Sequence, residues 1–169
     1  MITTHDDVLN GLLALSDQMR VWIYAANRPL SEEEAEHVRK SSAAFLENWQ
    51  SHGRQMNARI FILHQQFIIV LADEQAFTTS GCAIDSSVRF IKSLEDDLKL
   101  NLFDRMLVSY RDDEGTVQTV SFTEFSALAK DGLVSEDTIV FDHTVGTLGQ
   151  LKTRWEVPAS SSWHARLLE

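Results

Sequence analysis

The chain has 169 residues, of which 44% are hydrophobic, and its 25 acidic and 15 basic residues give a net charge of −10. That length fits one domain of about 100–200 residues. We therefore predict a single globular domain over residues 1–169, with residues 158–169 as a docked or exposed C-terminal tail. Nucleic acids and anionic membrane surfaces attract basic groups, so this charge indicates an acidic, soluble protein that binds neither.

Cysteine usage and the N-terminus both favour a cytoplasmic protein. Cys82 is the only cysteine, which excludes an internal disulfide and a zinc site built from several thiolates. The N-terminus lacks the basic region and the apolar run of a signal peptide. The longest strongly apolar stretch, residues 67–72, is far shorter than the roughly 20 residues of a membrane helix.

Hydrophobic spacing predicts a short helix at the start of the chain. Val8, Leu12 and Leu15 recur at helical intervals, which indicates a helix within residues 6–18. Residues 20–26, RVWIYAA, are rich in β-branched and aromatic side chains and are typical of a strand.

The clearest helix is predicted to begin at Ser31. Ser31 and Glu34 have the spacing of a capping box, in which each side chain bonds the backbone N–H of the other residue. Gly53 suits the left-handed conformation that ends many helices. One buried face is expected, formed by Ala35, Val38, Ser42, Phe45, Leu46 and Trp49.

Residues 58–63 and 66–72 are predicted to be two strands. The second run lacks polar alternation, which is typical of a strand covered on both faces. Only His64 and Gln65 separate the runs, and neither residue favours the positive φ of a two-residue turn. A hairpin and one continuous bent strand both remain open.

The second half of the chain mixes helices with short strands. An amphipathic helix is expected from about residue 82 or 85 to Lys99, and a hairpin from residues 106–110 and 116–121. A second capping box opens a short helix that Gly132 ends, and a short strand follows at residues 138–141. Residues 148–157 are ambiguous between helix and strand.

This order of elements predicts an α+β fold, a mixed and largely antiparallel sheet with helices packed on it. A doubly wound parallel α/β sheet is the alternative. Phosphate-loop, dinucleotide-binding, zinc-protease and serine-hydrolase motifs are all absent from the sequence, so no cofactor is expected.

The segment after the buried strand is the best candidate site. Loops beyond strand ends often carry binding groups, and the start of the following helix favours an anion or a thiolate. Cys82 is the candidate nucleophile, although a free cysteine is also a common core residue. The predicted ligand-binding set is Asp73, Glu74, Thr79, Ser80, Gly81, Cys82, Asp85 and Ser86. Capping alone would explain Ser80, Gly81 and Asp85.

The acidic residues and the C-terminal tryptophans carry two further hypotheses. Asp73 and Glu74 with Asp85 supply oxygen ligands suited to a divalent metal, although acidic residues in loops are more often simply solvated. The C-terminal segment offers Trp155, Trp163 and Arg166 as anchors for a partner, since Trp and Arg are frequent at interfaces.

Several strings resemble a family of short bacterial proteins of unknown function, often labelled "ABC transporter ATPase". They are RPLSEEE, FLENWQSHG, SGCAIDSSVRFIKSLE and FDRMLVSY, within a resemblance that runs from about Trp22 to His164. The most specific string is SGC[SA]IDSS, with Ala83 where serine is common. The resemblance implies one coherent domain, but no mechanism, because the chain lacks ATPase motifs.

The functional expectation is a cytosolic, non-enzymatic module that binds a protein or a small molecule. Two alternatives stay open. One is an enzyme that uses Cys82 as a nucleophile, or a carboxylate-bound metal near Asp73 and Asp85. The other is a structural subunit of a homo-oligomer, for which a homodimer is the commonest form.

Overall fold

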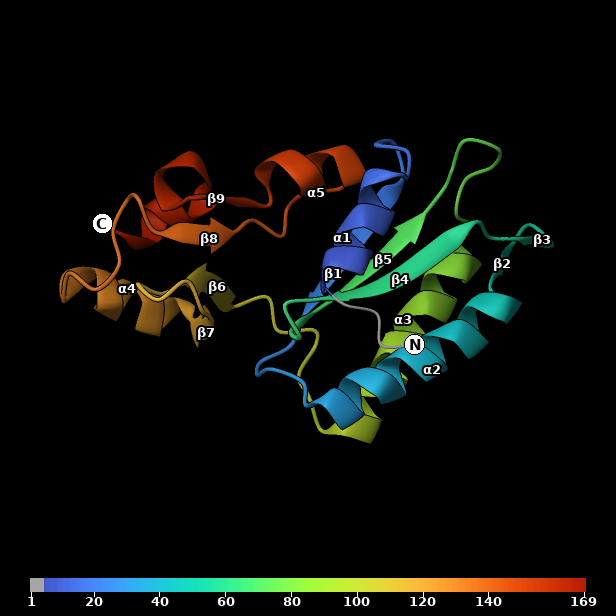
Figure 1. Ribbon diagram of the computed structural model, residues 1–169, viewed down its shortest axis with the longest axis horizontal. Helices are drawn as coiled ribbons and strands as arrows, with labels where there is room; N and C mark the ends of the chain where they lie inside the picture. Colours follow the sequence, from blue (N-terminus) through green and yellow to red (C-terminus); the bar gives the residue numbers. More distant parts are fainter. Residues whose placement is uncertain (1–4) are drawn as a thin grey trace. The chain divides into compact units, whose positions relative to one another are not determined.

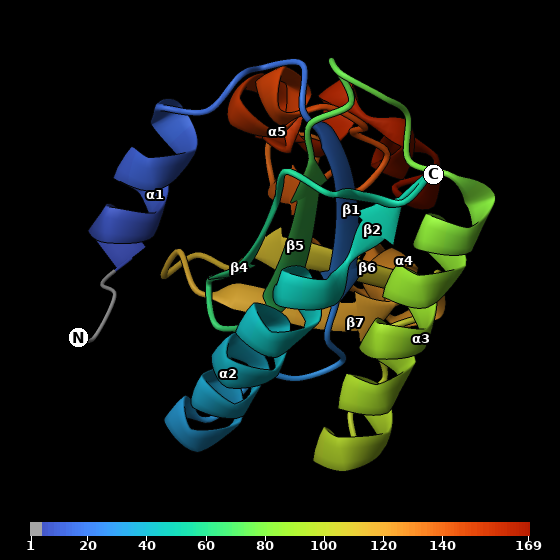
Figure 2. The same ribbon diagram turned by 90° about the vertical axis from the view of Figure 1, so that its right-hand side faces the viewer.

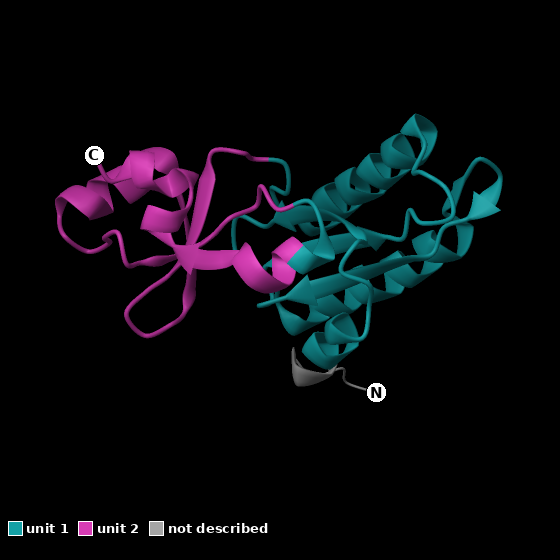
Figure 3. Ribbon diagram, turned by 90° about the horizontal axis from the view of Figure 1, so that it is seen from above, with its two compact units in different colours: residues 1–103, 146–149 teal, residues 104–145, 150–169 magenta. Residues whose placement is uncertain are grey.

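The structure, a computed structural model, describes residues 5–169, with side chains from residue 8 onward. The chain divides into two compact units (Figure 3). Unit 1 comprises residues 1–103 and 146–149, and unit 2 comprises residues 104–145 and 150–169. Every strand pair among the described residues is antiparallel, which confirms the predicted α+β fold. In the described part of the chain, no helix is long and apolar enough to cross a membrane.

Unit 1 is a three-stranded sheet with two long helices on one face (Figures 1 and 2). The strand order is β1-β5-β4, so β5 lies in the middle. Its elements are α1 (His5–Leu13), β1 (Arg20–Ala25), α2 (Glu32–Asn48), β2 (Gln50–Ser51), β3 (Arg54–Gln55), β4 (Ala58–Leu63), β5 (Phe67–Ala72) and α3 (Gly81–Leu98).

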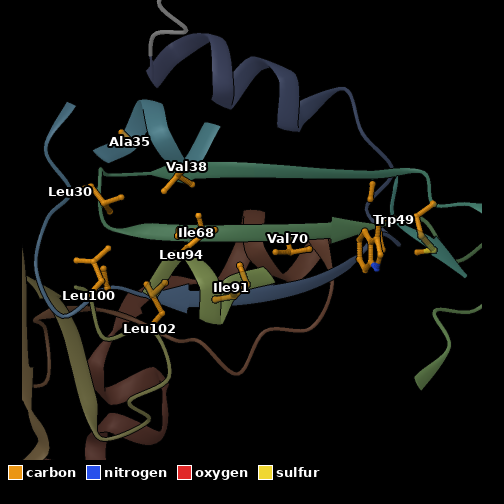
Figure 4. Close-up of a cluster of buried hydrophobic side chains, with 14 of the residues drawn as sticks. Leu30, Ala35, Val38, Trp49, Ile68, Val70, Ile91, Leu94, Leu100 and Leu102 are labelled. Atoms are coloured by element: carbon orange, nitrogen blue, oxygen red, sulfur yellow. The ribbon is translucent and has the colours of Figure 1, made fainter. Parts of the chain in front are cut away.

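The core of unit 1 lies between this sheet and helices α2 and α3 (Figure 4). Ile68 and Val70 of β5 face Val38 of α2 and Ile91 and Leu94 of α3, and all five are at most 1% exposed. Alternate residues of a strand point to opposite faces, yet all six residues of β5 are buried. The prediction of a strand covered on both faces is therefore confirmed.

The predicted capping box at the start of α2 is confirmed. Glu34 N donates to Ser31 Oγ at 3.2 Å, and Ser31 N donates to Glu34 Oε2 at 2.8 Å. Arg28 adds two hydrogen bonds to the same carboxylate, at 2.8 and 2.9 Å. The bonds from Arg28, followed by that from the Ser31 backbone, lower the pKa of Glu34 to about 2.

Replacing Ser31 with alanine is expected to lower the free energy of unfolding by about 1 kcal/mol, because the Glu34 N–H loses its acceptor. Urea unfolding followed by circular dichroism measures this loss. The control is Ser41→Ala inside the same helix, where alanine is the better helix former and no loss is expected. Equal effects of the two replacements would contradict a stabilising cap.

The predicted role of Gly53 is wrong. Helix α2 ends at Asn48 with Trp49 as its C-cap, and Trp49 is extended rather than left-handed. Gly53, at φ +72°, instead forms the turn of the β2–β3 hairpin together with His52, at φ +52°. A glycine after a helical pattern suits both positions, and the pairing of β2 with β3 decides between them.

The β4–β5 connection is a hairpin, although its turn residues are unfavourable. His64 and Gln65 both have φ near +50°, which non-glycine side chains rarely adopt. Tertiary contacts hold this turn: Leu30 N donates to Gln65 O at 2.7 Å, and buried Gln66 exchanges two hydrogen bonds with the backbone of Ala26. These hydrogen bonds offset the cost of the positive φ angles at His64 and Gln65, which the residue types of the turn do not favour.

Unit 2 is built on a four-stranded antiparallel sheet of order β7-β6-β8-β9. The predicted hairpin and the second capping box, between Ser121 and Glu124, are both present. The elements after α3 are β6 (Leu107–Arg111), β7 (Val117–Ser121), α4 (Phe122–Lys130), β8 (Ile139–Phe141), α5 (Leu148–Arg154), β9 (Glu156–Pro158) and the 3-10 helices η1 (Ala159–Ser161) and η2 (Trp163–Leu167).

Two ambiguous or overlong predictions are resolved by these bounds. The first helix ends at Leu13, five residues before the predicted limit at Gln18. Residues 148–157 are neither wholly helix nor wholly strand, because α5 ends at Arg154 and β9 begins at Glu156.

Candidate functional site

The loop between β5 and α3 carries most of the predicted binding residues, and its Glu74 carboxylate is bound internally. Thr79 N donates to Glu74 Oε1 at 2.9 Å, and Arg20 Nη1 of β1 lies 3.3 Å from the same oxygen. Burial by itself raises the pKa of Glu74. The hydrogen bonds from Thr79 and the charge of Arg20 outweigh that effect, and leave the pKa below its ordinary value. Glu74 therefore stays ionised and fixes the path of the loop.

Asp73 is held in the same way. Its carboxylate accepts hydrogen bonds from Asn57 Nδ2 at 3.2 Å and from Gln75 N at 2.9 Å. The Asp73 backbone N–H also donates to Asn57 O at 2.8 Å. These contacts join the loop to the residue before β4, which is a structural use of the carboxylate.

Ser80 is the N-cap of α3 and ties the helix to the β2–β3 hairpin. Its Oγ accepts the Ala83 N–H at 3.1 Å, and its own N–H donates to Ser51 Oγ at 2.9 Å. Ser51 Oγ in turn donates to Thr78 O at 2.9 Å. The Ser80 hydroxyl and N–H, which were predicted to bind an anion, are thus used to cap the helix and to anchor the loop.

Cys82 is exposed in the first turn of α3. Gly81 and Asp85 are exposed beside it, Ser86 is half-buried, and Thr79 is buried. The hydrogen bonds that His37, His143 and His164 form within the described residues go to Asp97, Trp155 and Ser162, and none of these bonds goes to the thiol. Across residues 5–169, no three His, Cys, Asp or Glu side chains gather as a metal ion would require.

The three predicted anchors of the C-terminal segment have different environments within unit 2. Trp155 is 4% exposed, and its ring packs edge-on against Phe141 at 5.0 Å. Trp163 is half-buried, 5.2 Å from the ring of Phe122, whereas Arg166 is exposed. Trp163 and Arg166 therefore reach the surface, and Trp155 serves the core.

Unit 2 also gathers a buried polar cluster that the sequence did not reveal. Asp142 and His164 are 4% and 1% exposed. His143 is half-buried, with its Nε2 atom inaccessible, and its Nδ1 accepts a hydrogen bond from buried Trp155. Asp142 Oδ1 accepts from Thr144 N at 3.0 Å and Thr144 Oγ1 at 2.6 Å. Asp142 and His143 are consecutive in the sequence, whereas His164 lies 21 positions after His143. Only the folded chain brings His164 near Asp142.

Burial lowers the pKa of both histidines to about 4, and Asp142 opposes the shift in each case. For His143, the neighbouring His164 lowers the pKa further. His164 Nδ1 lies 2.8 Å from Ser162 Oγ, but that hydroxyl also caps η2 by accepting the His164 N–H. Both imidazoles are therefore neutral at pH 7, and Ser162 has a structural use.

Comparison with family models, with curated proteins and with solved structures gives no match in any of the three. The resemblance to a bacterial family therefore stays a prediction, and the function is argued from the geometry of this chain.

Proposed function

We propose that the protein is a non-enzymatic interaction module that binds a protein partner through a partly apolar surface on unit 2. This surface, the Trp163 face, comprises Met106, Phe122, Trp163 and Arg166. The observation that carries the proposal is the half-exposed Trp163 ring, packed 5.2 Å from Phe122 and presented together with Arg166.

The members of the Trp163 face come from three segments that lie side by side. Phe122 N donates to Met106 O at 3.0 Å, which places the 58%-exposed Met106 beside the start of α4. Trp163 and Arg166 are three residues apart in η2, and residues at that spacing lie on the same side of a 3-10 helix. Ser126 Oγ donates to Leu167 O at 2.9 Å and joins η2 to α4.

The chemistry of this face suits a protein segment with an apolar side chain next to a carboxylate. Trp and Arg are the residue types most enriched among interface residues with large binding energies. Arg166 makes no ion pair within the described part of the chain, so its guanidinium is available for a bidentate bond to a carboxylate.

The β5–α3 loop supports this choice by contrast. The Asp73 and Glu74 carboxylates and the Ser80 hydroxyl are engaged in internal hydrogen bonds. Because Asp73, Glu74 and Ser80 already bond other groups of the chain, their side chains have less capacity left to bind a ligand.

Site-specific photo-crosslinking tests the proposal. A benzophenone amino acid at exposed Ser161, close to Trp163, is expected to give a discrete adduct with one partner in the source cells. The same group at Glu114, on the exposed hairpin tip of unit 2, is expected to give none.

A charge reversal makes the test specific to the face. Arg166→Glu is expected to reduce the Ser161 adduct at least about tenfold, since a lost charge-assisted bond of about 1.5–3 kcal/mol corresponds to that change or more. The matched control is Arg89→Glu on the exposed surface of α3. Equal adducts at both crosslinking positions, or equal losses in both charge variants, would refute the proposed surface.

A further inference from the structure

Two histidines of unit 2 are packed so that neither can gain a proton without disturbing its surroundings. His143 follows β8, and its Nδ1 accepts a hydrogen bond from Trp155 Nε1–H at 3.2 Å. An imidazole nitrogen that accepts this bond carries no proton. Protonation at Nδ1 therefore breaks the bond and leaves the buried indole N–H without its acceptor.

His164 is enclosed by rings from two elements. Its ring stacks on Trp163 with centroids 3.9 Å apart, and lies edge-on to Phe125 of α4 at 6.4 Å. The side chain is 1% exposed. A charged imidazolium in this position loses its hydration, and the surrounding aromatic packing replaces only part of it.

Asp142 is a charged group that acts on both histidines. Asp142 lies beside His143, but two hydrogen bonds from Thr144 engage its Oδ1, and Arg154 Nη2 lies 3.7 Å from its Oδ2. Glu156 of β9 is bound to Arg111 of β6 at 2.6 Å. The charge of His164 also lowers the pKa of His143. The Asp142 carboxylate, which favours the charged form of both histidines, is thus shared with Arg154. Two imidazolium ions here would repel each other, since the charge of His164 already disfavours a charge on His143.

We propose that His143 and His164 together make unit 2 an acid-sensitive element, which opens when both imidazoles are protonated. This acid-sensitive element does not require that the protein binds a partner. Opening would break the hydrogen bond between Trp155 and His143. It would also release η2, the segment that carries His164 and Trp163, from its packing.

The direction of the pH effect follows from proton linkage. The folded-state pKa of each histidine is about 4, below the ordinary value of 6.5, so the unfolded state binds more protons as the pH falls. The contribution of these two histidines to the stability of the fold is complete above pH 6.5, and it is lost as the pH falls from about 6.5 to 4. For each imidazole the unfolding equilibrium constant is expected to rise on the order of twentyfold between pH 7 and pH 5. Carboxylates with lowered pKa, such as Glu34 and Glu124, lose their contribution only below about pH 4.5.

Urea unfolding of the full chain at pH 7 and pH 5, followed by tryptophan fluorescence, tests the proposal. In the wild type, the unfolding constant is expected to be roughly a hundredfold or more larger at pH 5 than at pH 7. In the double variant His143→Gln, His164→Gln, the rise of the unfolding constant between pH 7 and pH 5 is expected to be less than about a tenth of the rise in the wild type, because glutamine does not titrate. The control His37→Gln, at a half-exposed histidine of α2 paired with Asp97, is expected to follow the wild type. Equal losses in the wild type and the double variant would overturn the proposal.

If the double variant does not fold, NMR titration of the wild-type histidines decides the question. Of the six histidines, two are expected to stay neutral down to about pH 4 while the protein is folded. Titration of all six near pH 6.5 in the folded protein would overturn the proposal.

Discussion

Replacing Trp49 with alanine is expected to lower the free energy of unfolding by about 3–5 kcal/mol, the usual range for a buried aromatic truncated to alanine. The side chain is 1% exposed, and its ring packs 5.3 Å from Phe45 and 6.5 Å from Trp22. Its Nε1–H donates to Ala83 O at 2.9 Å, in the first turn of α3. One side chain thus joins the end of α2, strand β1 and the start of α3, and a domain stable by about 5–15 kcal/mol loses a large share without it.

Urea unfolding measures the loss, and Trp49→Phe separates its two causes. Phenylalanine keeps most of the apolar volume but leaves Ala83 O without the indole donor, so we expect a smaller loss of about 1–3 kcal/mol. A loss below about 1 kcal/mol in Trp49→Ala would show that the core re-forms around the cavity, contrary to this prediction.

The second large effect is expected in unit 2, where Phe125→Ala removes the side chain at the centre of its core. Phe125 is fully buried, with ring centroids 5.5 Å from Tyr110 of β6 and 6.4 Å from His164 of η2. The expected loss is again about 3–5 kcal/mol. The control is Leu133→Ala just after α4, where the side chain is 65% exposed and a change within about 0.5 kcal/mol is expected. A similar loss in both variants would argue against a centre of packing at Phe125.

Trp49→Ala and Phe125→Ala together also test the predicted single domain. Each replacement lies within one of the two compact units. One shared unfolding transition that both replacements shift would confirm the prediction. Two transitions, each moved by a single replacement, would contradict it.

Short-range signals in the sequence predicted most elements of this fold. The capping boxes at Ser31 and Ser121 need only residues three apart, and the apolar run at residues 67–72 needs only its own composition. Such signals are local because a helix cap or a buried strand is recognisable from adjacent side chains. They failed where two local outcomes were equally acceptable, as at Gly53, or where distant contacts overcame local preference, as in the His64–Gln65 turn.

The predicted site shows the same division. The sequence correctly placed a loop between a buried strand and a helix, although the helix begins at Gly81, before the predicted start at residue 82 or 85. It also identified Ser80 as a capping residue. It could not determine that Arg20, Ser51 and Asn57, from other elements, would engage the loop's polar atoms. Hydrogen bonds between distant segments depend on how the strands pack. They follow no regular spacing along the chain, so the sequence pattern does not reveal them.

The sequence by itself determined the net charge, the helix caps, the buried strand β5 and the α+β class, because each depends on composition or on neighbouring residues. Only the tertiary structure decided which side chains are buried with one another. It brought His143 and His164 into one cluster, exposed Cys82, and placed Trp155 in the core while Trp163 reached the surface. The physical reason is that burial, and with it the pKa of an imidazole, depends on contacts between segments that the linear order of residues does not specify.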